Sequence, residues 1–172
     1  DEMNKEFVSL YLDGKADKLK PLDALSVYYD FREMTPIGRL GDAIVRKLAD
    51  RLVGVDLLDQ AAELLGYQID NRLRGAARAQ IAADLAVIHL LNNKPDRALA
   101  VLNKTRQAQL PTSVERQRRV VEAKALSDTG RADLALELIG PLTGSDIDRL
   151  KADILWRGKR WGEASERIEV ML

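Results

Sequence analysis

The chain has 172 residues and a formal net charge of zero, because 27 lysines and arginines balance 27 aspartates and glutamates. Proteins that hold nucleic acid through its phosphates carry a basic excess, so this balance argues against a nucleic-acid partner. The chain lacks cysteine and has one histidine, His89, which excludes disulfides, thiol nucleophiles, cysteine-ligated metals and two-histidine metal sites. No apolar run approaches the roughly 18 residues of a membrane helix, so we expect no membrane contact within this segment.

Residues 1–36 are predicted to form a helical extension or the end of an upstream repeat. Phe7, Leu10 and Tyr11 have the spacing of one helix face. Pro21 suits the first turn of a second helix. The glycines at 38 and 41 belong to no phosphate-binding motif, and they predict the start of the next helix.

Apolar residues further along the chain recur at helical spacing, as in Ile44, Leu48 and Leu52. Residues that break helices follow at short intervals and divide the chain into helices of about 10 to 18 residues. They lie at residues 92–95, 110–112, 129–130, 140–141 and 144–145. Because no segment alternates apolar and polar residues for long enough to form a strand, the sequence predicts an all-α chain.

Alanines mark four predicted helix pairs. The first helices carry alanine at 49, 86, 123 and 152, and the second helices carry it at 61, 98, 135 and 164. The spacing within a pair is always 12 residues, whereas the step between pairs is 37, 37 and 29 residues. Small side chains let two helix axes approach closely, so we predict that these alanines lie where the helices cross. The predicted units are residues 41–74, 75–111, 112–144 and 145–172, within a repeat domain of residues 37–172.

This pattern of small and large residues resembles the tetratricopeptide repeat (TPR) family, whose unit is a helical hairpin of about 34 residues. Residues 128–135 and 158–164 resemble the inter-helix turn of the family, and Trp161 occupies the position of the aromatic residue of that turn. Pro111 falls near the proline that ends the family's repeat. The sequence departs from the family at Arg119 and Asp148, where a large apolar residue is usual. The resemblance implies a right-handed α–α superhelix of about four hairpins, and a related α-solenoid is the alternative.

In the TPR family the first helices line a concave surface that binds peptides, and the resemblance implies such a groove here. The candidate partner-binding residues lie about one turn from the small residues: Arg46, Asp50, Gln80, Ala83, Val87, Gln117, Lys124, Arg149, Asp153 and Trp156. Trp156 is the strongest candidate for a binding hot spot, and packing of its ring against the next repeat is the alternative. One subgroup of the family holds the C-terminal carboxylate of a peptide with lysine and asparagine. We do not expect this carboxylate clamp here, because Arg46 and Asp50 stand where lysine and asparagine are needed.

Three arginines form a predicted basic patch at residues 116, 118 and 119. Because aromatic stacking platforms are missing nearby, a solvated helix face explains the patch better than a nucleic-acid site does. Ser145 or Asp146 is predicted to cap the helix that follows.

Two further features are interpreted without a functional role. His89 is predicted to pack between helices, because a catalytic base needs a nucleophile and an orienting group within reach. Residues 103–105 match the pattern for N-glycosylation, which we interpret as coincidence inside a helix. We therefore expect no catalytic residue, no cofactor and no metal.

The sequence predicts a non-enzymatic protein-interaction or scaffold segment of a larger protein. The alternatives are a structural spacer and a regulatory module that packs on a neighbouring domain of the same chain. The compartment stays open, with the cytoplasm favoured, because targeting signals can lie outside this segment.

The amphipathic pattern continues to the last residue without a stop signal, so we expect the chain to be a piece of a longer protein. Its C-terminal edge is predicted to be apolar and exposed. We expect this edge to form a two-fold homodimer contact, and it comprises Ile154, Leu155, Trp156, Ile168, Val170, Met171 and Leu172.

Overall fold

The computed structural model describes residues 2–171, and within them the chain forms ten α-helices, two short 3-10 helices and no strand. This confirms the all-α prediction. The helices are α1 (Glu2–Leu12), α2 (Pro21–Asp30), α3 (Arg39–Gly54), α4 (Leu58–Asn71), α5 (Gly75–Leu91), α6 (Pro95–Lys104), α7 (Thr112–Asp128), α8 (Ala132–Ile139), α9 (Ser145–Arg157) and α10 (Trp161–Met171). The 3-10 helices are η1 (Lys15–Lys18) and η2 (Arg32–Met34).

The chain divides into two compact units, Asp1–Leu73 and Arg74–Leu172. The sequence predicts an earlier boundary, after residue 36. The first unit extends past that boundary because α1 and α2 both pack against α3. Arg51 of α3 secures this packing by donating hydrogen bonds to the carbonyl oxygens of Ala16 at 2.9 Å and Leu19 at 2.6 Å.

The start of α3 depends on two glycines, as the sequence predicts. Gly38 is the N-cap residue with φ +94°, in the left-handed region that favours glycine. Gly41 is buried, and a Cβ atom on it would collide with the carbonyl oxygen of Pro36. A side chain at position 41 would therefore displace the chain that leads into α3, whereas one at position 38 would strain the backbone of the N-cap residue.

Buried tyrosines connect the helices of the first unit. The Tyr11 hydroxyl donates a hydrogen bond to the carbonyl oxygen of Ala24 at 2.8 Å, and the Gln68 amide donates one to the Tyr28 hydroxyl at 2.9 Å. Burial raises the pKa of Tyr11 to about 12, with a smaller contribution from Tyr28. Both hydroxyls are thus held neutral and satisfied, which a polar group in a core requires.

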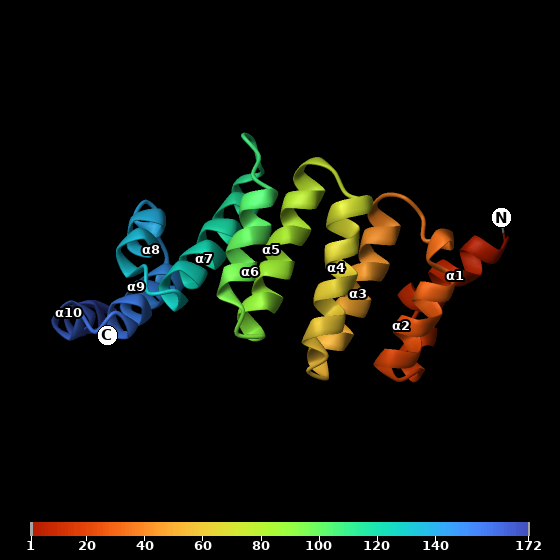
Figure 1. Ribbon diagram of the computed structural model, residues 1–172, viewed down its shortest axis with the longest axis horizontal. Helices are drawn as coiled ribbons and strands as arrows, with labels where there is room; N and C mark the ends of the chain where they lie inside the picture. The colour runs from red at the N-terminus through yellow and green to blue at the C-terminus, as the bar shows by residue number, and fades with distance from the viewer. Residues whose placement is uncertain (1, 172) are drawn as a thin grey trace. The chain divides into compact units, whose positions relative to one another are not determined.

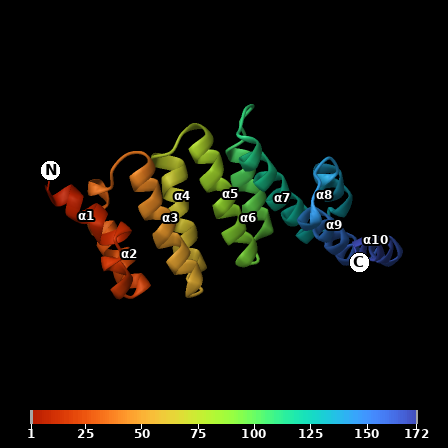
Figure 2. The ribbon, with the colours of Figure 1, turned by 180° about the vertical axis from the view of Figure 1, so that it is seen from behind.

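The second unit consists of three hairpins, α5–α6, α7–α8 and α9–α10, and each hairpin packs against the next one along the chain. Figures 1 and 2 show α5 beside α6 along the length of the shorter helix. One cluster of its core joins the first two hairpins and contains Ala86, Ala98, Leu99, Leu102, Val121 and Ala125. The other joins the last two hairpins and contains Ala123, Ala135, Ile139, Leu150 and Ile154.

The eight alanines of the four helix pairs are all buried, with at most 6% of each residue exposed. Ala61 and Ala86, for example, are fully inaccessible. A methyl group fills the space between close helices at no cost in side-chain entropy. Their prediction as packing positions is therefore confirmed.

The turns inside the four hairpins repeat with the same steps as the alanines. Each has one residue with positive φ, namely Asp56 at 62°, Asn93 at 53°, Gly130 at 80° and Lys159 at 61°. The amide of the next residue then donates to the carbonyl oxygen five residues back, as Lys94 does to His89 at 2.8 Å. This arrangement ends one helix and directs the chain into the next. Only one of the four turns has glycine at the position of positive φ.

Candidate functional site

The predicted groove residues are divided between the two compact units. Arg46 and Asp50 are exposed on α3 in the first unit, on a charged surface that also includes exposed Arg39 and half-buried Asp42 and Lys47. The other predicted residues lie on α5, α7 and α9 of the second unit.

An open groove of about 330 Å³ lies between α5, α7 and α9. Three predicted residues line it, one from each helix: Val87, Lys124 and Asp153. The other lining residues were not predicted from the sequence, and they are Leu90, Leu91, Val121, Ser127, Asp128, Leu150, Ile154 and Arg157. Most of them lie three or four residues from a predicted residue, so extending the helical stripe by one turn would have found them.

The floor of the groove is apolar and fixed. Val121, Leu150 and Ile154 are at most 7% exposed and belong to the core clusters. On the α5 side the rim remains open to solvent, since Val87 is 37% exposed and Leu91 is 59% exposed. The groove thus offers apolar side chains that no other part of the described chain covers.

The opposite rim of the groove is charged. The Arg157 guanidinium bridges two carboxylates, with Nη1 2.8 Å from Oδ1 of Asp128 and Nε 2.9 Å from Oδ2 of Asp153. The carboxylates come from different helices, α7 and α9. Lys124 lies one turn before Asp128 and is exposed. The rim therefore holds two acids and two bases around an apolar floor.

Two predicted groove residues form internal hydrogen bonds. The Gln80 amide donates to Oε1 of Gln117 at 2.7 Å, and the Gln117 amide donates to Oδ1 of Asp84 at 3.0 Å. This chain of bonds links α5 to α7 and is half-buried. Gln80 and Gln117 thereby fix the spacing of the two helices that form one side of the groove.

The remaining predicted residues lie outside the groove or below its surface. Ala83 is fully buried in α5, so its prediction as a partner contact is wrong. Arg149 is exposed on α9 but does not line the groove. Trp156 is 55% exposed and packs edge-on against Trp161, with ring centroids 4.7 Å apart and planes at 75°.

The three arginines of the predicted basic patch lie in two different environments. Arg118 is only 7% exposed, so its place on a solvated face is wrong. Its guanidinium donates to the carbonyl oxygens of Ala79 and Leu102, both at 2.8 Å, and to Oγ1 of Thr105 at 3.1 Å. Burial lowers the pKa of Arg118, and the Glu122 carboxylate opposes this shift.

Arg116 and Arg119 remain at the surface in ion pairs. Arg116 donates two hydrogen bonds to the Asp146 carboxylate, at 2.8 and 2.7 Å. Arg119 pairs with Glu115, one turn earlier on α7, at 2.6 Å. Asp146 therefore does not cap α9 as predicted, because Gly144 is the N-cap residue and no side chain caps this helix.

The glycosylation pattern and the histidine are both in packed surroundings. The Thr105 hydroxyl is buried and donates to the carbonyl oxygen of Val101 at 2.8 Å. His89 is half-buried in α5. Neither residue lines the groove.

The C-terminal edge differs from its prediction on α9. Ile154 and Leu155 are at most 5% exposed, because they pack inside the second unit. On α10, in contrast, Ala164 is the one buried residue among those described. The exposed apolar residues of this edge are Trp156, Trp161, Ile168, Val170 and Met171, and Leu172 lies outside the described residues.

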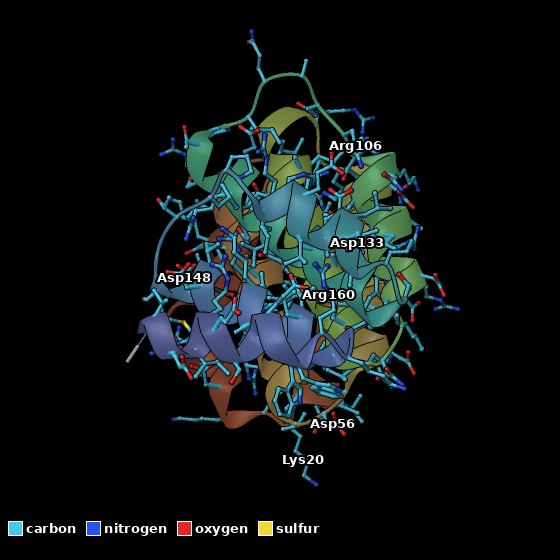
Figure 3. The ribbon with its side chains drawn as sticks, turned by 90° about the vertical axis from the view of Figure 1, so that its left-hand side faces the viewer. Lys20, Asp56, Arg106, Asp133, Asp148 and Arg160 are labelled. Atoms are coloured by element: carbon cyan, nitrogen blue, oxygen red, sulfur yellow. The ribbon has the colours of Figure 1, made fainter. Side chains whose placement is uncertain are left out.

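The α9–α10 hairpin is held to α8 by Arg160. Its guanidinium points toward Asp133 and pairs with it at 2.7 Å (Figure 3). The same guanidinium forms two hydrogen bonds with Glu163, at 2.8 and 2.7 Å. Arg160 therefore bridges two carboxylates outside the groove, as Arg157 does at its rim.

Two further kinds of feature are absent from residues 2–171. No group of three or more histidine, aspartate or glutamate side chains there is placed to hold a metal ion. No helix in that range combines the length and the apolar character needed to cross a bilayer.

Comparison of the chain with protein-family models, with curated proteins and with solved structures finds no match.

Proposed function

We propose that this protein is a non-enzymatic interaction module that holds a segment of a protein partner in the groove between α5, α7 and α9. The observation that carries the proposal is the combination of an apolar floor, an exposed apolar rim at Val87 and Leu91, and a charged rim opposite. Interaction sites commonly have an apolar centre within a polar rim. The groove volume is at the low end of the range for ligand pockets, which suits a few side chains of a peptide.

The proposal includes a finer description of the fold, a TPR-like right-handed superhelix of about four hairpins. Its support is the repetition of buried alanines and of positive-φ turns with steps of 37, 37 and 29 residues. In such a fold the first helices of the hairpins form one continuous face. The groove residues come from the first helices of three consecutive hairpins.

A groove of this kind gains affinity mainly from buried apolar side chains. Complete burial of one leucine or phenylalanine contributes about 1.5–3 kcal/mol. Two such side chains, with the losses that accompany association, give a weak or moderate complex. This strength is typical of exchangeable peptide binding.

The test is selection of random 12-residue peptides on the intact chain, followed by fluorescence anisotropy with the selected peptides. Leu91→Asp should weaken their binding at least tenfold, because it places a carboxylate at the mouth of the apolar groove. Leu134→Asp is the matched control, since Leu134 has a similar exposure of 51% and lies on α8 outside the groove. Equal binding by the Leu91 variant and the wild type would refute the proposal.

The apolar surface of α10 favours a second candidate, a module that packs on another copy or on a neighbouring domain. Trp161, Ile168 and Val170 are 50%, 40% and 88% exposed. Light scattering over a range of concentrations tests self-association, which Ile168→Lys should abolish. A monomer mass at every concentration would refute the homodimer. Packing on a neighbouring domain would then be the one form of this second candidate that is left.

A further inference from the structure

The rim of the groove holds two carboxylates that lie close enough together for one cation to pair with both. Asp128 on α7 and Asp153 on α9 lie 2.8 and 2.9 Å from nitrogens of the same guanidinium, that of Arg157. One planar guanidinium can therefore satisfy both carboxylates at once. A cation supplied by a partner would meet the same geometry.

Arg157 holds this position weakly. Its side chain is 57% exposed, and those of Asp128 and Asp153 are 30% and 51% exposed. Ion pairs this exposed contribute little to stability, because water and salt screen them. Arg157 can thus move into solvent and leave both carboxylates to another cation at small cost.

The apolar floor lies directly beside these carboxylates. Ile154 is on the same helix as Arg157, one turn earlier, and Leu150 is one further turn back. A segment that fits both features has a basic residue next to a large apolar one. An acidic segment would find only Lys124 available, because Arg157 is already shared between two carboxylates.

We propose, on the basis of the function proposed above, that the groove selects peptide segments in which arginine or lysine stands beside a large apolar residue. The cation of the segment replaces Arg157 between Asp128 and Asp153, while the apolar side chain enters the floor of the groove. Arg157 acts as an internal competitor that keeps the two carboxylates neutralised until a partner binds.

This proposal predicts changes in affinity of opposite sign. With the selected peptides, Arg157→Gln should strengthen binding about two- to fivefold, because it removes the competitor. Asp128→Asn and Asp153→Asn should each weaken binding by a similar factor, and a peptide with glutamine in place of its basic residue should lose the same factor. All of these residues are exposed or half-buried, so the variants should keep the circular dichroism and melting temperature of the wild type.

Arg160→Gln is the matched control, since Arg160 also bridges two carboxylates, Asp133 and Glu163, away from the groove. It should leave peptide affinity unchanged. Selection of acidic or purely apolar peptides, or weaker binding by Arg157→Gln, would overturn the inferred charge preference. If those peptides still lost affinity with Leu91→Asp, the groove would remain the binding site and only its preference would be refuted.

Discussion

Replacement of Arg118 by methionine tests how the second unit is held together. The guanidinium lies between three helices and donates to the carbonyl oxygens of Ala79 and Leu102 and to the Thr105 hydroxyl. Methionine fills a similar volume but donates no hydrogen bond. Arg118→Met therefore leaves these buried acceptors with fewer partners while it removes a buried charge.

The net loss of stability follows from these two opposing effects. Hydrogen bonds from a charged donor contribute about 1.5–3 kcal/mol each, so the two bonds at 2.8 Å contribute about 3–6 kcal/mol. Loss of the guanidinium returns part of its desolvation cost, which is several kcal/mol for a buried ion. We expect a net destabilisation of about 2–3 kcal/mol, or about 5–10 °C in Tm for a chain of this length.

Urea denaturation followed by circular dichroism measures this loss. Arg119→Met is the matched control on the same helix, because the Arg119 side chain is 37% exposed and pairs with Glu115 at the surface. That variant should lose at most about 0.5 kcal/mol. If both variants lost the same stability, the structural role assigned to the buried Arg118 would be wrong.

Three further predictions concern packing, turns and pH. Ala86→Leu should overpack the α5–α6 crossing and cost about 1–3 kcal/mol, so an unchanged melting temperature would contradict the packing role. Lys159→Gly should stabilise the α9–α10 turn by about 0.5–1 kcal/mol, because φ is +61° there. Gly130→Ala, at φ +80°, should destabilise the α7–α8 turn by about 1 kcal/mol. Urea denaturation measures both changes in the free energy of unfolding, which should have opposite signs. Because burial raises the pKa of Tyr11 to about 12 from an unfolded value of 10.0, folding favours the neutral phenol, and its contribution is complete below pH 10 and lost as pH rises from 10 to 12. Tyr11→Phe should flatten this alkaline loss of stability, and an unchanged slope between pH 10 and 12 would show that Tyr11 does not titrate in this way.

The sequence alone determined the local structure of this protein. Helical periodicity, helix breakers and the alanine spacing predicted an all-α chain and the buried positions Ala86 and Ala98, and the structure confirms both. Gly38 and Gly41 predicted the start of α3. These features could be predicted because they depend on residues within one hairpin, where spacing along the chain fixes neighbourhood in space.

The candidate site could be predicted only in part. One groove residue on each of three helices was found, namely Val87, Lys124 and Asp153. The ion pair of Arg157 with Asp128 joins residues 29 positions apart. Such a contact depends on how α7 and α9 pack, which no local pattern specifies.

Only the tertiary structure decided which charged side chains are buried and which are exposed. Arg118 follows Val114 and precedes Val121 on the buried stripe of α7, so its position indicated burial while its charge indicated exposure. The conflict is resolved by acceptors on other helices, the carbonyl oxygens of Ala79 and Leu102, which lie 39 and 16 residues away. A buried cation is tolerated where distant parts of the chain supply its hydrogen bonds, and that supply exists only after the helices have packed.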